Sequence, residues 1–103
     1  MANTDNSFTK MPNDILCALY ASRLSSKQLR VFLYIAKWTG GYDIPRPLSV
    51  KKMSKDMCED RRNLVRTIRD LECMGMIETF RNGNGIRTDF RVLPVESWDR
   101  KVT

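Results

Sequence analysis

Arginine side chains recur on one side of a helix predicted over residues 60–74. The polar residues of that helix are Arg61, Arg62, Asn63, Arg66, Thr67 and Arg69. At about 100° per residue, most of them lie opposite an apolar stripe of Leu64, Ile68 and Leu71. Arginine offers a planar fork that matches O6 and N7 of guanine, and asparagine can pair with adenine in a similar way. The spacing therefore predicts a helix that reads the base edges of a duplex, with a merely solvated face as the alternative.

A second helix, predicted over residues 50–57, must help to position this one, because only a corner at residues 58–60 separates them. Ser49 and Asp60 suit the N-cap positions, since their side-chain oxygens can accept hydrogen bonds from free amides of the first turn. The outward-facing lysines of the second helix are Lys51, Lys52 and Lys55. The first helix of a helix-turn-helix crosses the DNA backbone, so we expect these lysines to contact phosphates or to face water.

Two strands, predicted over residues 76–81 and 86–93, follow the helix pair after Gly75, which suits the left-handed position at a helix end. The turn between them, Asn82-Gly83-Asn84-Gly85, favours the positive φ angles of a hairpin. The polar residues around it are Arg81, Asn82, Asn84 and Arg87. Such a hairpin can lie along phosphates or enter a minor groove, although hairpin tips are also polar simply because they are wet.

A short strand at Leu48 precedes the helix pair, after residues 39–47, whose glycines and prolines predict a loop. Two further amphipathic helices are predicted, one over residues 13–22 and one from its N-cap Ser25 to about Trp38. The core positions expected on them are Ile15, Leu16, Leu19, Tyr20, Leu29, Phe32, Leu33, Ile35 and Ala36. Together the elements predict an α+β, mostly helical fold: a winged helix-turn-helix with four helices, a short strand and a C-terminal β-hairpin wing.

The length of 103 residues fits one domain. We expect residues 1–7 to form a flexible leader, 8–93 the winged-helix domain and 94–103 a C-terminal tail from which Trp98 folds back. Eighteen Lys and Arg against twelve Asp and Glu give a formal charge of +6, which favours polyanionic partners. The sequence has no run of about 18 apolar residues and no signal peptide, so we expect a cytoplasmic protein without membrane contact.

Catalysis and metal binding have no candidate residues. The chain contains no histidine, which excludes Ser-His-Asp and Cys-His sites, and its three cysteines form no Cys-x-x-Cys pair. The acids Asp56, Glu59, Asp60, Asp70 and Glu72 are spread over caps and helix surfaces. We therefore expect no enzymatic activity, no metal site and no cofactor.

Motifs in a fixed order give the chain a family resemblance. They are SFTKMPNDIL at 7–16, LS at 24–25, QLRVF at 28–32, KWTGGY at 37–42, LS at 48–49, RRNLVR at 61–66 and LECMGMI at 71–77. Over about residues 8–80 the sequence resembles the N-terminal domain of lambdoid phage replication initiators of the O-protein type. The resemblance implies a winged helix that binds repeated origin sites as a homodimer, with the helix of Arg61, Arg62, Asn63 and Arg66 in the major groove. It also implies a protein partner in the replication machinery.

One segment departs from that family. Its members usually have neutral residues at the corner between the two helices, whereas this chain carries Asp56, Glu59 and Asp60 there. Like charges beside phosphate weaken binding.

Three functions remain open from the sequence. The first is sequence-specific binding of double-stranded DNA in phage or prophage replication initiation, with Arg62, Asn63 and Arg66 reading bases. Arg61 and Arg69 would then hold phosphates. The second is a small transcriptional regulator of a mobile element. The third is a stand-alone winged-helix adaptor or inhibitor that binds a protein through the acidic corner and exposed aromatics, namely Tyr42 and Trp98.

Overall fold

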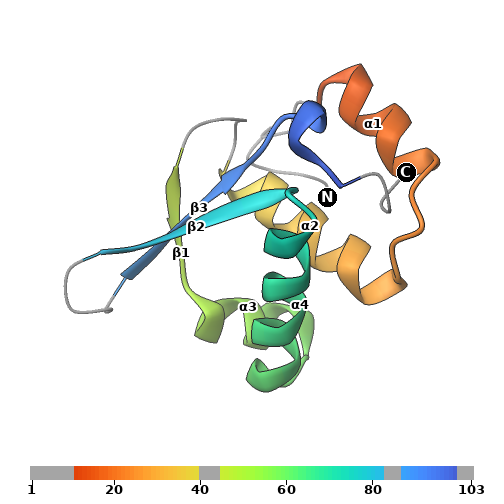
Figure 1. The fold of residues 1–103 in the computed structure, drawn as a ribbon. Coiled ribbons are helices and arrows are strands. Elements are labelled where there is room, and N and C mark those ends of the chain that lie inside the picture. Colours follow the sequence, from red (N-terminus) through yellow and green to blue (C-terminus); the bar gives the residue numbers. More distant parts are fainter. Residues whose placement is uncertain (1–10, 40–44, 83–86, 100–103) are drawn as a thin grey trace, which may run out of the picture.

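Helices make up most of the regular structure in the computed structural model, which describes residues 11–39, 45–82 and 87–99 (Figure 1). The elements, in order, are α1 (Asn13–Tyr20), α2 (Ser26–Thr39), β1 (Arg46–Leu48), α3 (Val50–Met57), α4 (Arg61–Cys73), β2 (Ile77–Asn82), β3 (Arg87–Val92) and the 3-10 turn η1 (Val95–Ser97). Four α-helices and a three-stranded sheet in the described residues confirm the predicted α+β, mostly helical class. Figure 1 shows α3 and α4 together at one end of the molecule, with the β2–β3 hairpin reaching away from the helices.

Side-chain caps start three of the helices. Before α2, the Ser25 hydroxyl accepts from the Gln28 amide at 3.1 Å, and the Gln28 side chain accepts from the Ser25 amide at 3.0 Å. Ser49 caps α3 by accepting from the Lys52 amide at 3.2 Å, as predicted. Asp60 caps α4 in the same way, which confirms its predicted role. Each cap satisfies an amide that the helix itself leaves without a partner.

The three strands form an antiparallel sheet in the order β1-β3-β2. Phe80 of β2 stands opposite Asp89, and Asp89 in turn stands opposite Pro47 of β1. The loop predicted over residues 39–47 is wrong at both of its ends. Thr39 is the last residue of α2, and residues 46 and 47 belong to β1. A proline fits β1 because this strand lies at the edge of the sheet, where its missing amide costs no hydrogen bond.

The core gathers side chains from every helix and from β2 and β3. Its buried members are Ile15, Ala18, Val31, Phe32, Ile35, Ala36, Met53, Leu64, Ile68, Leu71, Met76, Ile77, Phe90, Val92 and Trp98. Two predicted core positions are wrong: Tyr20 is 82% exposed and Leu33 is 41% exposed. At about 100° per residue, Tyr20 lies roughly 200° round the helix from buried Ala18, and Leu33 lies as far from Val31. Periodicity found the helices but placed these two side chains on the wrong side.

The described residues after β3 pack against the core through Trp98. The ring of Trp98 meets that of Phe32 edge-on, with 5.5 Å between centroids, and its indole N–H donates to the Leu93 carbonyl at 3.1 Å. Gly75, at φ +74°, lies so close to this segment that a Cβ there would stand 2.1 Å from the Ser97 carbonyl oxygen. The left-handed glycine after α4 was predicted, and the expectation that Trp98 folds back on the core is confirmed.

Candidate nucleic-acid interface

Helix α4 has a buried side and an open side. Leu64 and Leu71 are fully buried and Ile68 is 6% exposed, so this stripe holds the helix against the core. The exposed arginines on the other side are Arg61, Arg62, Arg66 and Arg69; we refer to these four residues as the arginine surface. Arg62, Arg66 and Arg69 follow one another at helical spacings of four and three, and the rise per residue spreads them over about 10 Å.

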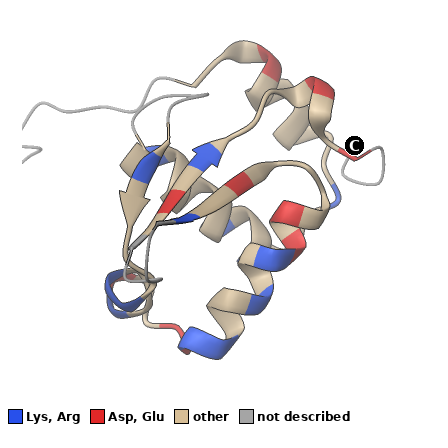
Figure 2. Cartoon of the chain, turned by 60° about the vertical axis from the view of Figure 1, so that its left-hand side comes forward, with Lys and Arg blue, Asp and Glu red and all other residues tan. Residues whose placement is uncertain are grey.

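None of the four guanidinium groups makes a hydrogen bond or ion pair with any part of the chain that the structure describes. They border an open hollow on α4, together with the exposed Val65 and the carboxylate of Asp70. Figure 2 shows the basic positions running along the outer side of this helix. The arginine surface therefore carries a concentrated positive charge that the fold does not neutralise.

Two residues predicted with the arginines are oriented differently. Thr67 is only 5% exposed, and its hydroxyl donates to the Asn63 carbonyl at 2.8 Å within the helix. Its predicted place on the binding face is wrong, because position 67 lies next to Leu64 and Ile68 on the buried side. Asn63 is half-buried, and its side chain helps to lower the pKa of Glu59, so it lies at the inner margin of the arginine surface.

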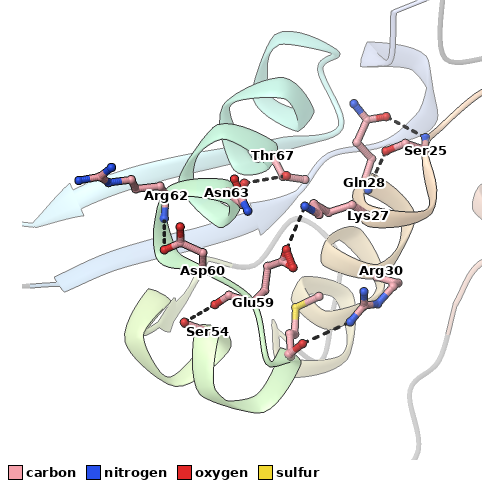
Figure 3. Close-up of polar contacts among 11 residues, drawn as sticks. Ser25, Lys27, Gln28, Arg30, Ser54, Glu59, Asp60, Arg62, Asn63 and Thr67 are labelled. Atoms are coloured by element: carbon pink, nitrogen blue, oxygen red, sulfur yellow. Dashed lines mark hydrogen bonds and ion pairs between the residues drawn. The ribbon is translucent and has the colours of Figure 1, made fainter.

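The acids of the corner make contacts within the domain, and Figure 3 shows those of Glu59 and Asp60. Glu59 pairs with Lys27 of α2 at 2.9 Å, and this contact is the main reason why the pKa of Glu59 is lowered. Asp60 accepts from the Arg62 amide as the cap of α4, at 3.4 Å. Asp56 accepts from the Tyr34 hydroxyl at 2.7 Å, and burial together with this carboxylate raises the pKa of Tyr34 to about 12. The negative charge that distinguishes the corner thus serves to join α2, α3 and α4.

The protein-binding surface predicted from the acidic corner, Tyr42 and Trp98 loses one of its aromatic residues. Trp98, expected as an exposed aromatic, is 8% exposed, so this expectation is wrong. Tyr42 lies outside the described residues.

The lysines of α3 are exposed, as expected. Lys51 and Lys55 are open to solvent, whereas the ammonium of Lys52 stands 4.2 Å from the centroid of the Trp38 ring. In Figure 2 the basic positions of α3 and those of the first turn of α4 lie at the same end of the molecule.

The hairpin adds one described basic side chain to this region. Arg81 is exposed and lines a groove between α4 and the hairpin that Arg69 also lines. Glu72 and Thr79 line it too and are joined by a hydrogen bond of 2.8 Å. The sequence did not show that Arg69 and Arg81 share this groove, since they lie on different elements.

The remaining predicted hairpin residues are placed only in part. Asn82 and Arg87 stand opposite each other at the ends of β2 and β3. Asn84 lies outside the described residues.

Comparisons with protein-family models, with curated proteins and with solved structures find no match to this chain. The resemblance to lambdoid phage initiators therefore stays a prediction. Among the helices of the described residues, none has both the length and the apolar character needed to cross a membrane. In the same residues, cysteines and acids form no group of three or more that could hold a metal ion.

Proposed function

We propose that the chain is a winged-helix protein that binds double-stranded DNA with sequence specificity and serves as the origin-binding domain of a phage or prophage replication initiator. In this proposal α3 and α4 form the helix-turn-helix and β2–β3 forms the wing. The order helix, strand, two helices and hairpin, with the short β1 pairing along β3, supports this description. The replication role rests on the ordered motifs that resemble lambdoid initiators.

One observation carries the DNA-binding proposal: four arginines without partners in the described chain cover the open side of a helix whose other side is fixed in the core. An isolated solvated arginine is ordinary, but four within three helical turns repel one another and favour a polyanion. A rigid helix with a free face also has the dimensions to enter a major groove, which is about 12 Å wide.

Within the arginine surface the residues would divide the work. Arg62 and Arg66 would read guanine edges through bidentate hydrogen bonds, and Arg61 and Arg69 would hold phosphates on either side. Arg81 would extend the phosphate contacts from the hairpin, because it shares a groove with Arg69. Asn63, at the inner margin, would reach a base only where α4 lies deep in the groove.

Selection of binding sites from a random duplex library tests this function directly. We expect enrichment of a defined motif, and its half-site spacing would report whether two copies bind side by side. A titration on the selected duplex should lose affinity steeply with salt, with a slope of about −0.9 per phosphate contacted. Enrichment of no motif, with no duplex binding at low salt, would contradict the proposal. A motif that recurs at promoters rather than at origin repeats would retain DNA binding but replace replication with transcriptional control.

A further inference from the structure

Trp38 is an unusual surface residue, because 43% of it is exposed although tryptophan is among the side chains that gain most from burial. The other tryptophan, Trp98, is 8% exposed and packs in the core. Trp38 therefore presents a large flat ring to solvent at the end of α2.

Two cations stand over this ring. The Lys52 ammonium, from α3, lies 4.2 Å from the ring centroid, and the Lys37 ammonium, from α2, lies 4.9 Å from it. Neither lysine has an ion pair within the described part of the chain. Asp56, the acid of α3, accepts from the Tyr34 hydroxyl at 2.7 Å. We call Lys37, Trp38 and Lys52 the lysine–tryptophan cluster.

The ring is also held from the side. Tyr34 lies one helical turn earlier on α2, with 6.0 Å between its ring centroid and that of Trp38 and a tilt of 46°. The hydrogen bond from Tyr34 to Asp56 ties this support to α3. The cluster is therefore positioned by side chains of two helices, which the Tyr34–Asp56 hydrogen bond joins.

We propose that the lysine–tryptophan cluster binds single-stranded nucleic acid, a function beyond the duplex binding proposed for α4. A base stacks on the Trp38 ring, and Lys37 and Lys52 take the phosphates on either side of it. Bases within a duplex are already stacked on one another, so only an unpaired strand offers a free face to the ring.

The strengths of the competing contacts favour the replacement of a lysine by a base on the Trp38 ring. A cation over an exposed aromatic ring contributes only about two- to five-fold in an equilibrium constant. Stacking of one base on an aromatic side chain contributes about five- to 150-fold by alanine substitution. An arriving base can therefore displace a lysine from the ring, and that lysine then gains a phosphate as a stronger partner.

The test uses the full chain and a fluorescent oligodeoxythymidine of about ten nucleotides, within the usual site size of such proteins. Anisotropy should rise with protein concentration, and the intrinsic fluorescence of Trp38 should be quenched as a base stacks on it. Trp98 provides a background that does not respond, because it is buried against Phe32. Oligouridine of equal length distinguishes RNA from DNA as the preferred strand.

Matched variants separate stacking from charge. Trp38→Ala should weaken binding about five- to 150-fold, and Trp38→Phe should restore much of it, because a phenyl ring still stacks. Lys37→Gln with Lys52→Gln should flatten the salt dependence by about 0.7 for each lost phosphate contact. Leu33→Ala is the control, since Leu33 is exposed on the same helix but outside the cluster.

A second pair of measurements keeps this inference independent of the proposed function. Arg62→Ala with Arg66→Ala should lower duplex binding and leave oligodeoxythymidine binding unchanged, whereas Trp38→Ala should do the reverse. The inference fails if the wild-type chain does not bind the oligonucleotides or if Trp38→Ala binds as tightly as the parent. It also fails if polyglutamate of matched charge quenches Trp38 equally well, since that result would indicate an acidic protein partner.

Discussion

Acidic and basic side chains meet at the α3–α4 corner, but the fold uses them differently. Each corner acid has a partner inside the domain: Glu59 has Lys27, Asp60 has the start of α4, and Asp56 has Tyr34. The four residues of the arginine surface have none in the described chain. This difference implies that the acids stabilise the domain while the arginines remain available to a ligand. A count of formal charges along the sequence would suggest only that the corner acids offset the positive charge of the arginines.

The largest expected effect tests the arginine half of this comparison. Arg62→Ala and Arg66→Ala should each weaken binding to the selected duplex by about 1–3 kcal/mol, because each loses a bidentate contact to a base. Their free energies of unfolding should stay within about 0.5 kcal/mol of the parent, as expected for exposed residues. Anisotropy titrations and thermal melts measure the two quantities separately. Unchanged duplex affinity in both variants would remove the base-reading role.

For the corner acids we expect the opposite pattern, with lower stability and no loss of duplex affinity. Asp60→Ala removes the N-cap of α4 and should lower the free energy of unfolding by about 1 kcal/mol. Affinity for the duplex, per folded molecule, should not fall, since the substitution removes a negative charge. Asp70→Ala is the matched control, because Asp70 is exposed on the same helix and its carboxylate caps nothing in the described structure. Equal destabilisation by both substitutions would show that the cap is not the cause.

A smaller effect follows from the Lys27–Glu59 ion pair. The paired lysine lowers the pKa of Glu59 below its ordinary value of 4.5, so the folded state favours the ionised carboxylate. Its contribution to stability is present above pH 4.5 and is lost as the pH falls through the lowered value. In Glu59→Gln this part of the acid sensitivity should be absent from urea midpoints recorded between pH 6 and pH 3. The control Glu96→Gln, on η1, should retain it.

The smallest effect lies at alkaline pH. Burial and Asp56 raise the pKa of Tyr34 from 10.0 to about 12, so the folded state favours the protonated hydroxyl. The stability contributed by this group is present below pH 10 and is lost as the pH rises toward 12. Tyr34→Phe should lack this loss, and spectrophotometric titration should show one tyrosine fewer with a raised pKa. An alkaline transition identical to that of the parent would contradict the contact with Asp56.

Local signals in the sequence predicted much of the fold. Ser25, Ser49 and Asp60 each act through an amide two or three residues away, and Gly75 through its own positive φ, so their residue types were enough to place helix ends. The hairpin was predicted for the same reason.

The burial of individual side chains and the contacts between different elements could not be predicted in this way. Thr67 sits near the border of its apolar stripe, where a small rotation of the helix decides burial, whereas the apolar type of Leu33 gave no sign that the core lies on the other side of α2. The contact between Trp38 and Lys52 joins two helices across the predicted loop, and no periodic pattern links those positions. The arginine surface was found because it lies on one helix, whereas the partners of Glu59 and Asp56 lie on α2, far away in the sequence.

Pro47 has a consequence for how this protein behaves at high concentration. β1 pairs with β3 on one side only, and its outer edge includes a residue that cannot donate a backbone hydrogen bond. A neighbouring molecule therefore finds no continuous template along β1, while the outer edge of β2 pairs with no other strand of the described residues. Growth of a filament by strand addition needs two sheet edges on each subunit that can pair. Any association of this domain through its sheet edge should therefore end at a dimer.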